Sequence, residues 1–136
     1  MIRIMAIGAL LLFDASVNSP GSIDFYEGNN GTQTKHCTFS DAPSQSYNLK
    51  KRGHPCPNDD LRSVVLNDVR AGAIIRVYDD PKGRPNKDDW TEIIVKKPHQ
   101  QYIVHHFERT YEDEFVKVTY HSDNGLNGRV SHIKID

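Results

Sequence analysis

The sequence predicts an all-β domain. Eight short runs rich in Val, Ile, Tyr, Phe and Thr recur along the chain, and clusters of Gly, Asn, Asp or Pro separate most of them. This pattern is typical of strands joined by turns. No window repeats apolar residues at the spacing of an amphipathic helix. Because parallel sheets need crossover connections that are usually helical, these observations favour an antiparallel sandwich or barrel.

The expected strands follow one another at short intervals. They cover residues 23–26, 36–39, 63–66, 73–78, 92–96, 102–107, 115–120 and 130–135. Residues 44–53 are expected to hold no more than a helical turn. Asn-Gly pairs at 124/125 and 127/128 tolerate the positive φ of tight hairpins. Residues 124–128 are therefore expected to be the turn that joins the last two strands.

The size and charge of the chain argue against several classes of protein. With 136 residues, 37% of them hydrophobic, one core is expected. The 17 Lys and Arg residues nearly balance the 18 Asp and Glu residues. The chain therefore lacks the basic surface of a nucleic-acid-binding protein and the polybasic patch of a membrane-surface protein. We expect a monomer without a membrane span.

The first 21 residues differ in composition from the rest. Arg3 supplies one positive charge, and residues 6–13 form an apolar run that is too short to span a bilayer. This arrangement fits a secretory signal with a cleavage region at 15–16 or 19–22. Residues 1–21 are therefore predicted to be a signal peptide or leader, and the protein to be secreted. A plain first strand or a disordered leader is the alternative interpretation.

Two cysteines, Cys37 and Cys56, flank a polar loop rich in Ser, Pro and Lys. In an exported protein the two are expected to pair and to stabilise the fold by about 3 kcal/mol in the chain-entropy model. In the cytosol both would remain thiols. No Cys-x-x-Cys or Cys/His spacing indicates a structural zinc site.

Two sequence patterns occur twice. "IDFYE" at 23–27 resembles "IRVYD" at 75–79, since both alternate apolar and polar residues and end in Tyr followed by an acid. "NDDLRSVVL" at 58–66 resembles "EDEFVKVTY" at 112–120, where acidic residues precede a strand. Because both pairs keep nearly the same offset, we interpret the chain as a duplicated unit that forms two Greek keys. Chance recurrence of strand patterns in an all-β chain is the alternative.

At these residues the chain resembles the βγ-crystallin superfamily, in particular its microbial two-motif members. "IDFYEGNN" with "NDDLRSVVL" matches the first key of that family well, and "IRVYDDPKG" with "EDEFVKVTY" matches the second key loosely. The resemblance implies a sandwich of two keys at about 22–69 and 73–136, with 122–136 added as a C-terminal hairpin. "GTQ" at 31–33 replaces the aromatic-x-Gly that often follows the Tyr-Glu hairpin.

The resemblance also implies two calcium sites between the keys. Such proteins hold each ion with backbone carbonyls, a hydroxyl and an acid of the other key, which suits the preference of calcium for oxygen ligands. The first site would use the Glu27 and Asp60 carbonyls and the Asp113 carboxylate. Its hydroxyl position is Arg62, whose permanent charge repels a cation. We expect the Arg62 guanidinium to take the place of the metal.

The second implied site would use the Asp79 and Glu114 carbonyls and the Asp59 carboxylate. Its hydroxyl position is Val116, which offers no oxygen. Both sites are therefore expected to be degenerate and to bind calcium weakly or not at all. No other cofactor is expected.

Two further groups of polar residues have structural interpretations. Asp88 and Asp89 echo the acidic motif but follow Tyr78 too soon, so we interpret them as a turn before a strand rather than as ligands. His105 and His106 are neighbours on an expected strand and point to opposite faces, so they are not expected to share a metal ion.

No residue pattern indicates catalysis. Cys37, Cys56 and Ser63 are the candidate nucleophiles, but none lies in a nucleophile elbow. We therefore expect a secreted, non-enzymatic, βγ-crystallin-like protein with a structural or stress-related role. One alternative is a secreted effector, such as an antimicrobial or killer-toxin-like protein or a protease inhibitor, that acts on a protein or cell-surface target. A hydrolase is the third and least favoured alternative.

Overall fold

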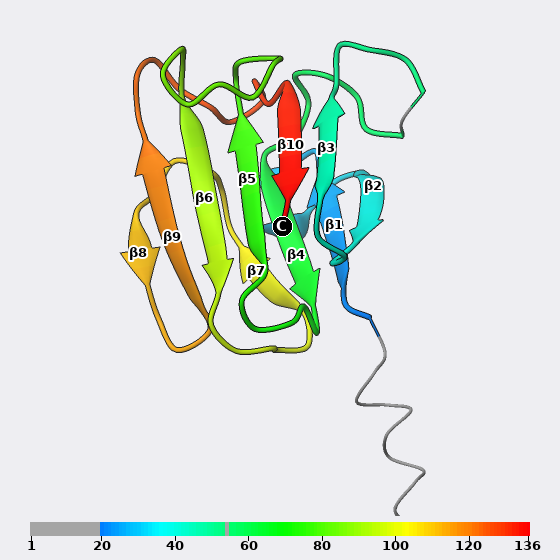
Figure 1. The fold of residues 1–136 in the computed structure, drawn as a ribbon, viewed down its shortest axis with the longest axis vertical. Coiled ribbons are helices and arrows are strands. Elements are labelled where there is room, and N and C mark those ends of the chain that lie inside the picture. The colour runs from blue at the N-terminus through cyan, green and yellow to red at the C-terminus, as the bar shows by residue number, and fades with distance from the viewer. Residues whose placement is uncertain (1–19, 54) are drawn as a thin grey trace, which may run out of the picture.

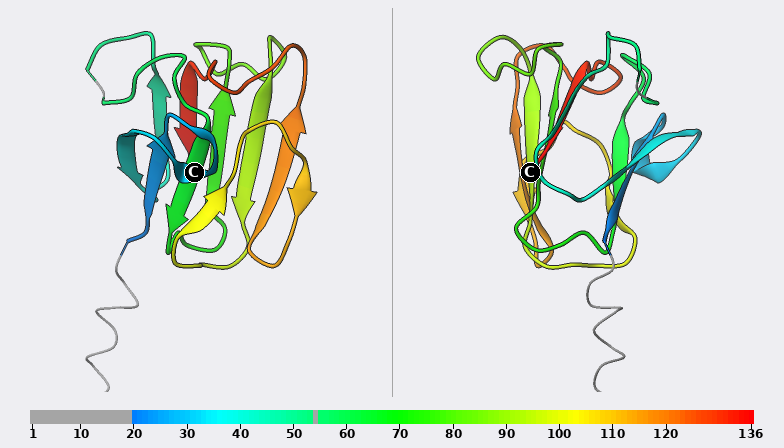
Figure 2. Two further views of the ribbon diagram at one scale, coloured as in Figure 1. Left: turned by 180° about the vertical axis from the view of Figure 1, so that it is seen from behind. Right: turned by 45° about the vertical axis from the view of Figure 1, so that its right-hand side comes forward.

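The computed structural model describes residues 20–53 and 55–136. Residues 1–19 of the predicted leader lie outside the described residues. The described chain forms two antiparallel sheets (Figure 1), which confirms the all-β prediction. The right-hand view of Figure 2 shows the sheets as two separate layers. In this part of the chain, no helix is long and apolar enough to cross a membrane.

The smaller sheet has the strand order β2-β1-β4-β7. Its strands are Ser22–Tyr26 (β1), Lys35–Ser40 (β2), Ser63–Asn67 (β4) and Tyr102–Val104 (β7). A short 3-10 turn, Asn29–Gly31 (η2), follows β1. The larger sheet has the order β3-β10-β5-β6-β9-β8. Its strands are Gln45–Asn48 (β3), Ile74–Tyr78 (β5), Trp90–Val95 (β6), Tyr111–Glu112 (β8), Val116–His121 (β9) and His132–Ile135 (β10).

The strands β3 and β7 each lie in a different sheet from the strand that precedes it in the sequence. β3 lies between β2 and β4 in the sequence, yet it pairs with β10 of the larger sheet. β7 follows β6 in the sequence, yet it pairs with β4 of the smaller sheet. Each half of the chain therefore contributes one strand to the sheet that the other half builds, so neither sheet is completed by one half alone.

The core fills the space between the two layers. Burial alternates along β5 and β6, so that Ile75, Val77 and Ile93 are inaccessible to solvent. Ile23 and Phe25 of the smaller sheet are likewise fully buried. Burying a side chain of this size stabilises a fold by roughly 1.5–3 kcal/mol. The alternation seen in the sequence thus identifies the inward faces correctly.

The structure confirms a disulfide between Cys37 on β2 and Cys56 in the loop before β4. Both cysteines are buried, and their Cα atoms are 5.2 Å apart. The bond fixes the loop that follows β3 to the smaller sheet. This loop carries the residues that enter β4, so the disulfide also restrains the start of that strand.

The predicted equivalence of residues 112–120 with 58–66 is wrong. β4 pairs with β1 and places Ser63 opposite Tyr26. The strand that pairs with β5 in the same way is β10, which places His132 opposite Tyr78. β9 instead pairs with β6 and β8. The hairpin β8–β9 therefore lies at the edge of the larger sheet and precedes β10, the strand that pairs with β5 as β4 pairs with β1.

Two other predictions about local structure are also wrong. The expected C-terminal hairpin at 122–136 does not form, because β10 lies between β3 and β5 and is not adjacent to β9. Residues 45–48 form β3 and not a helical turn. Pairing with β10 and stacking of the Tyr47 ring on Phe39, with centroids 4.7 Å apart, outweigh the weak strand pattern of this polar segment.

We expect reduction of the Cys37–Cys56 bond to lower the free energy of unfolding by about 3 kcal/mol, because the open chain gains loop entropy when it unfolds. Urea denaturation of the protein with and without reductant measures the difference. The double variant Cys37→Ala/Cys56→Ala is the control, and its midpoint should not respond to reductant. An oxidised and a reduced protein of equal stability would contradict this role for the bond.

Candidate functional site

Two loops cross at the end of the sandwich where β4 and β10 begin, the upper end in Figure 1. One loop precedes β4 and the other precedes β10. The Asp59 amide donates to the Val130 carbonyl at 3.1 Å, and the Gly128 amide donates to the Leu61 carbonyl at 2.9 Å. Because these two hydrogen bonds are reciprocal, Asp59 occupies a position equivalent to that of Gly128. Leu61 likewise occupies a position equivalent to that of Val130.

Each loop is also fixed to the end of the first strand of its own half. The Arg62 amide donates to the Tyr26 carbonyl at 2.9 Å, and the Ser131 amide donates to the Tyr78 carbonyl at 2.7 Å. Two equivalent places result, one after each tyrosine. We name them the Glu27 corner (Glu27, Asp60, Arg62 and Gly128) and the Asp79 corner (Asp59, Asp79, Asp88 and Ser131).

A guanidinium fills the Glu27 corner. The Arg62 Nη1 donates to the Glu27 carbonyl oxygen at 3.5 Å. A Cβ atom added to Gly128 would lie 2.8 Å from the Arg62 Nη2, so the guanidinium packs directly against the Gly128 backbone. The matching residue in the other loop is Asp59. This corner therefore has a cationic group and a glycine, and it lacks the facing acid that the Asp79 corner has.

The Asp79 corner contains carboxylate and hydroxyl oxygens from both halves of the chain, and such oxygens can ligate a cation. The Ser131 Oγ donates to the Asp59 Oδ1 at 3.2 Å. Carboxylate oxygens of Asp79, Asp88 and Asp89 lie within 4.8 Å of one another. The Asp79 Oδ2 is buried and accepts no hydrogen bond from any described residue. A buried oxygen without a donor is costly, so this atom needs a partner.

The electrostatics of Asp79 agree with this need. Burial and the neighbouring charges of Asp88, Asp59 and Asp89 raise the pKa of Asp79 to about 6. Arg129 opposes the shift, but its Nε lies 3.8 Å from the Asp79 Oδ2, which is too far for a hydrogen bond. The corner thus holds more negative charge than its one nearby arginine neutralises.

Asp89 has its own hydrogen-bond partners. Its side chain is buried and accepts bonds from the Tyr120 hydroxyl and from the amides of Asn124 and Gly125. Burial alone would raise the pKa of Asp89, yet these bonds lower it to about 2. Asp89 therefore stays ionised and holds the loop after β9 against β6. The acidic residues of this group that remain available to bind a cation are Asp59, Asp79 and Asp88.

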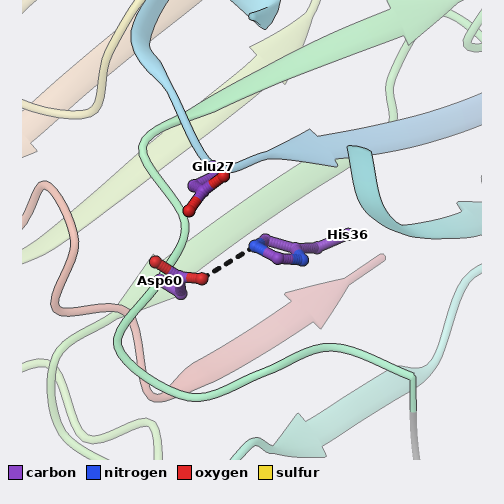
Figure 3. Close-up of side chains that lie close together, drawn as sticks. All are labelled: Glu27, His36 and Asp60. Carbon is purple, nitrogen blue, oxygen red and sulfur yellow. Dashed lines mark hydrogen bonds and ion pairs between the residues drawn. The ribbon is translucent and has the colours of Figure 1, made fainter. Parts of the chain in front are cut away.

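Four of the predicted ligand residues lie at the corners: Glu27, Asp59, Asp60 and Asp79. The charge of Asp59 contributes to the raised pKa of Asp79, so the two carboxylates interact electrostatically. The Asp60 carboxylate turns toward β2, where its Oδ2 lies 2.8 Å from the His36 Nε2 (Figure 3).

The other predicted ligands lie at the opposite end of the sandwich, so both predicted sets are wrong in part. Asp113 accepts a hydrogen bond from the Tyr102 hydroxyl, and Glu114 pairs with Lys97 at 2.8 Å. Val116 begins β9 and therefore lies far from the crossing loops. The reason is that residues 113–116 belong to the turn and second strand of the inserted hairpin.

An open groove of about 580 Å³ lies between the edge strands β7 and β8. Tyr102, Tyr111 and Phe115 supply aromatic surface to it, and Asp113 supplies a carboxylate. The Arg109 guanidinium lies over the Tyr111 ring, 4.6 Å from its centroid. The inserted hairpin creates this groove, because residues 109–115 form one of its walls.

Sequence reasoning missed Ser131, Gly128 and the part played by Asp88. The segment "NGRVSH" at 127–132 matches "NDDLRS" at 58–63 only in its asparagine and in the apolar residue at the fourth position. That weak signal could have been found by aligning the residues before the last strand. The inserted hairpin hid it, because it makes the second unit longer than the first.

We expect Asp79→Asn to stabilise the metal-free protein at pH 7. The folded Asp79 carboxyl keeps its proton up to about pH 6, whereas the unfolded one loses it near pH 3.8. Its stabilising contribution is therefore complete below pH 3.8 and is lost as the pH rises through 6. The gain at pH 7 should be on the order of 2 kcal/mol and should shrink as the pH falls to 4.

Urea denaturation in chelator at pH 4, 5.5 and 7 measures this difference. The matched control is Asp123→Asn at an exposed turn, which should follow the wild type at each pH. An Asp79→Asn variant that is less stable than the wild type at pH 7 would show that the Asp79 carboxylate is paired and not repelled.

Comparison with known proteins provides no relative for this chain. No protein-family model, no curated protein and no solved structure matches it.

Proposed function

We propose that this chain is an exported, non-enzymatic, βγ-crystallin-like protein that binds one calcium ion at the Asp79 corner. The observation that carries the proposal is the buried Asp79 Oδ2, which has no hydrogen-bond donor among the described residues and faces other oxygen ligands. A calcium ion there would supply the missing partner and neutralise the repulsion among the carboxylates.

The strand order supports two Greek keys. In a Greek key the fourth strand returns to lie beside the first. β4 lies beside β1, and β10 lies beside β5. In each key the third strand, β3 or β7, pairs with the sheet of the other key. The second key also carries the β8–β9 hairpin between its third and fourth strands. The reciprocal loop contacts at the corners support the same pairing of two equivalent units.

The donor set of the Asp79 corner fits calcium. Asp59, Asp79 and Asp88 offer carboxylates, Ser131 offers a hydroxyl, and no nitrogen or sulfur ligand is among them. Calcium takes six to eight oxygen ligands in flexible geometry, so waters and backbone carbonyls would complete the shell. Arg129 offsets part of the negative charge, which favours weak binding with a Kd of about 0.1–1 mM, typical of extracellular modules.

The Glu27 corner does not fit calcium in the same way. Arg62 donates to the carbonyl that an ion would need, and Gly128 offers no carboxylate. A guanidinium that donates to the carbonyl provides the positive charge without a metal. We infer that Arg62 holds this corner closed and that one calcium ion binds per chain.

Export and a structural role are supported by the disulfide and by the apolar leader. Disulfides persist in oxidising compartments, where calcium is also abundant enough to fill a weak site. The bond and the ion would act on the same loops, since Cys56 and Asp59 belong to one segment. The aromatic groove beside β8 favours a second candidate, an effector that recognises an external target through that surface.

Calcium should bind with a stoichiometry of one in calorimetry and should raise the melting temperature. A ligand that binds only the native state at ten times its Kd adds about 1.4 kcal/mol to the free energy of unfolding. Asp59→Asn and Asp79→Asn should remove the shift, and Ser131→Ala should weaken it. Asp113→Asn is the matched control, because Asp113 lies at the far end of the sandwich. An unchanged shift in Asp59→Asn would reject the Asp79 corner.

The approximate symmetry of the corners also permits a gain of function. Gly128 has a φ of 77°, close to the φ of 62° at Asp59, so an acid at 128 can adopt the same conformation. We expect Arg62→Ser/Gly128→Asp to bind a second calcium ion, because it restores a hydroxyl and a facing carboxylate to the Glu27 corner. Arg62→Ser alone should not create this site. A double variant that folds and still binds one ion would refute the equivalence of the corners.

A further inference from the structure

The side chains of two residues of the Glu27 corner, Glu27 and Asp60, belong to a further cluster with His36. Glu27 follows β1, His36 lies on β2, and Asp60 lies in the loop before β4. One ligand atom from each residue lies within 4.8 Å of the other two. Figure 3 shows the three side chains converging from three separate segments of the chain.

The Glu27 carboxylate lies close to the ion pair of His36 and Asp60. His36 and Asp60 contact each other, with 2.8 Å between the Nε2 and Oδ2 atoms. The Glu27 carboxylate has no hydrogen bond or ion pair with any residue in 20–53 or 55–136. Two carboxylates at this separation repel each other unless a cation lies between them. The His36 side chain lies beside both carboxylates, and neutral imidazole nitrogen commonly acts as a metal ligand.

The mixture of one imidazole and two carboxylates selects the class of ion. Calcium needs six or more oxygen ligands, and the Glu27 carbonyl, which would be one of them, already accepts a bond from Arg62. Zinc needs only four ligands and binds imidazole nitrogen and carboxylate oxygen. The two carboxylates together carry more charge than the single nearby guanidinium, so a divalent cation is still attracted.

The disulfide holds this cluster in place. His36 is adjacent to Cys37 on β2, and Asp60 shares a loop with Cys56. Because Cys37 and Cys56 are bonded, the strand with the imidazole and the loop with the carboxylate are joined close to both ligands. A site whose ligands are fixed before binding loses less conformational entropy on binding.

We propose that Glu27, His36 and Asp60 bind a divalent transition-metal ion of the zinc class. Three protein ligands leave a fourth coordination position open to water or to a side chain of a partner. The site is separate from the calcium site of the Asp79 corner and uses none of its residues. Calcium binding at the Asp79 corner and zinc binding at this cluster can therefore be tested separately, and the failure of one does not reject the other.

Titration calorimetry with zinc chloride tests the site, on the purified protein with its disulfide intact and with calcium present in excess. We expect one zinc ion per chain. His36→Gln and Glu27→Gln should each weaken binding by at least about tenfold, since even the loss of an outer-shell partner commonly costs 10–100-fold. In NMR spectra the His36 imidazole resonances should shift as zinc is added.

His99→Gln is the matched control, because His99 packs against Phe115 on the inserted hairpin and not near the cluster. It should bind zinc as the wild type does. Wild-type protein that binds no zinc, or His36→Gln that binds it with unchanged affinity, would overturn the proposal. Circular dichroism of each variant shows whether it is folded, and Asp60→Asn gives a second, near-isosteric ligand test.

Discussion

The exchange of β3 and β7 between the two layers is the constraint on which the rest of the structure depends. Because each half of the chain supplies a strand to the sheet of the other half, the halves cannot separate without breaking backbone pairs in both layers. The same exchange brings the loops before β4 and β10 across each other. Their two reciprocal amide–carbonyl bonds then set the spacing of the side chains at both corners.

The two corners show how one backbone arrangement supports different chemistry. Asp59 and Gly128 have nearly the same backbone conformation, but only one of them carries a carboxylate. Arg62 and Ser131 also match in position, and one is a permanent cation while the other is a neutral hydroxyl. The Glu27 corner therefore supplies its positive charge from a side chain. The Asp79 corner is left with the buried Asp79 Oδ2 close to the Asp88 carboxylate.

Features that depend on neighbouring residues could be predicted from the sequence, and features that depend on distant pairing could not. The alternation in β1 and β5 and the likeness of Tyr26-Glu27 to Tyr78-Asp79 are local, and the sequence shows both. The strand β3 owes its conformation to β10, which follows more than eighty residues later. The match between Asp59 and Gly128 was hidden because the inserted hairpin lengthens the second unit and itself imitates an acidic motif before a strand.

The inserted hairpin also determines which strand forms one edge of the larger sheet. Without it, β6 would be an edge strand of the larger sheet, and the backbone groups on the outer side of its six residues would be unpaired. With it, the edge strand is β8, which has only two residues. One of them, Glu112, forms an ion pair with Lys96. A short edge strand with charged side chains offers few backbone groups for pairing with a strand of another molecule. The inserted hairpin therefore disfavours edge-to-edge pairing with a second copy of the chain. It also forms one wall of the groove.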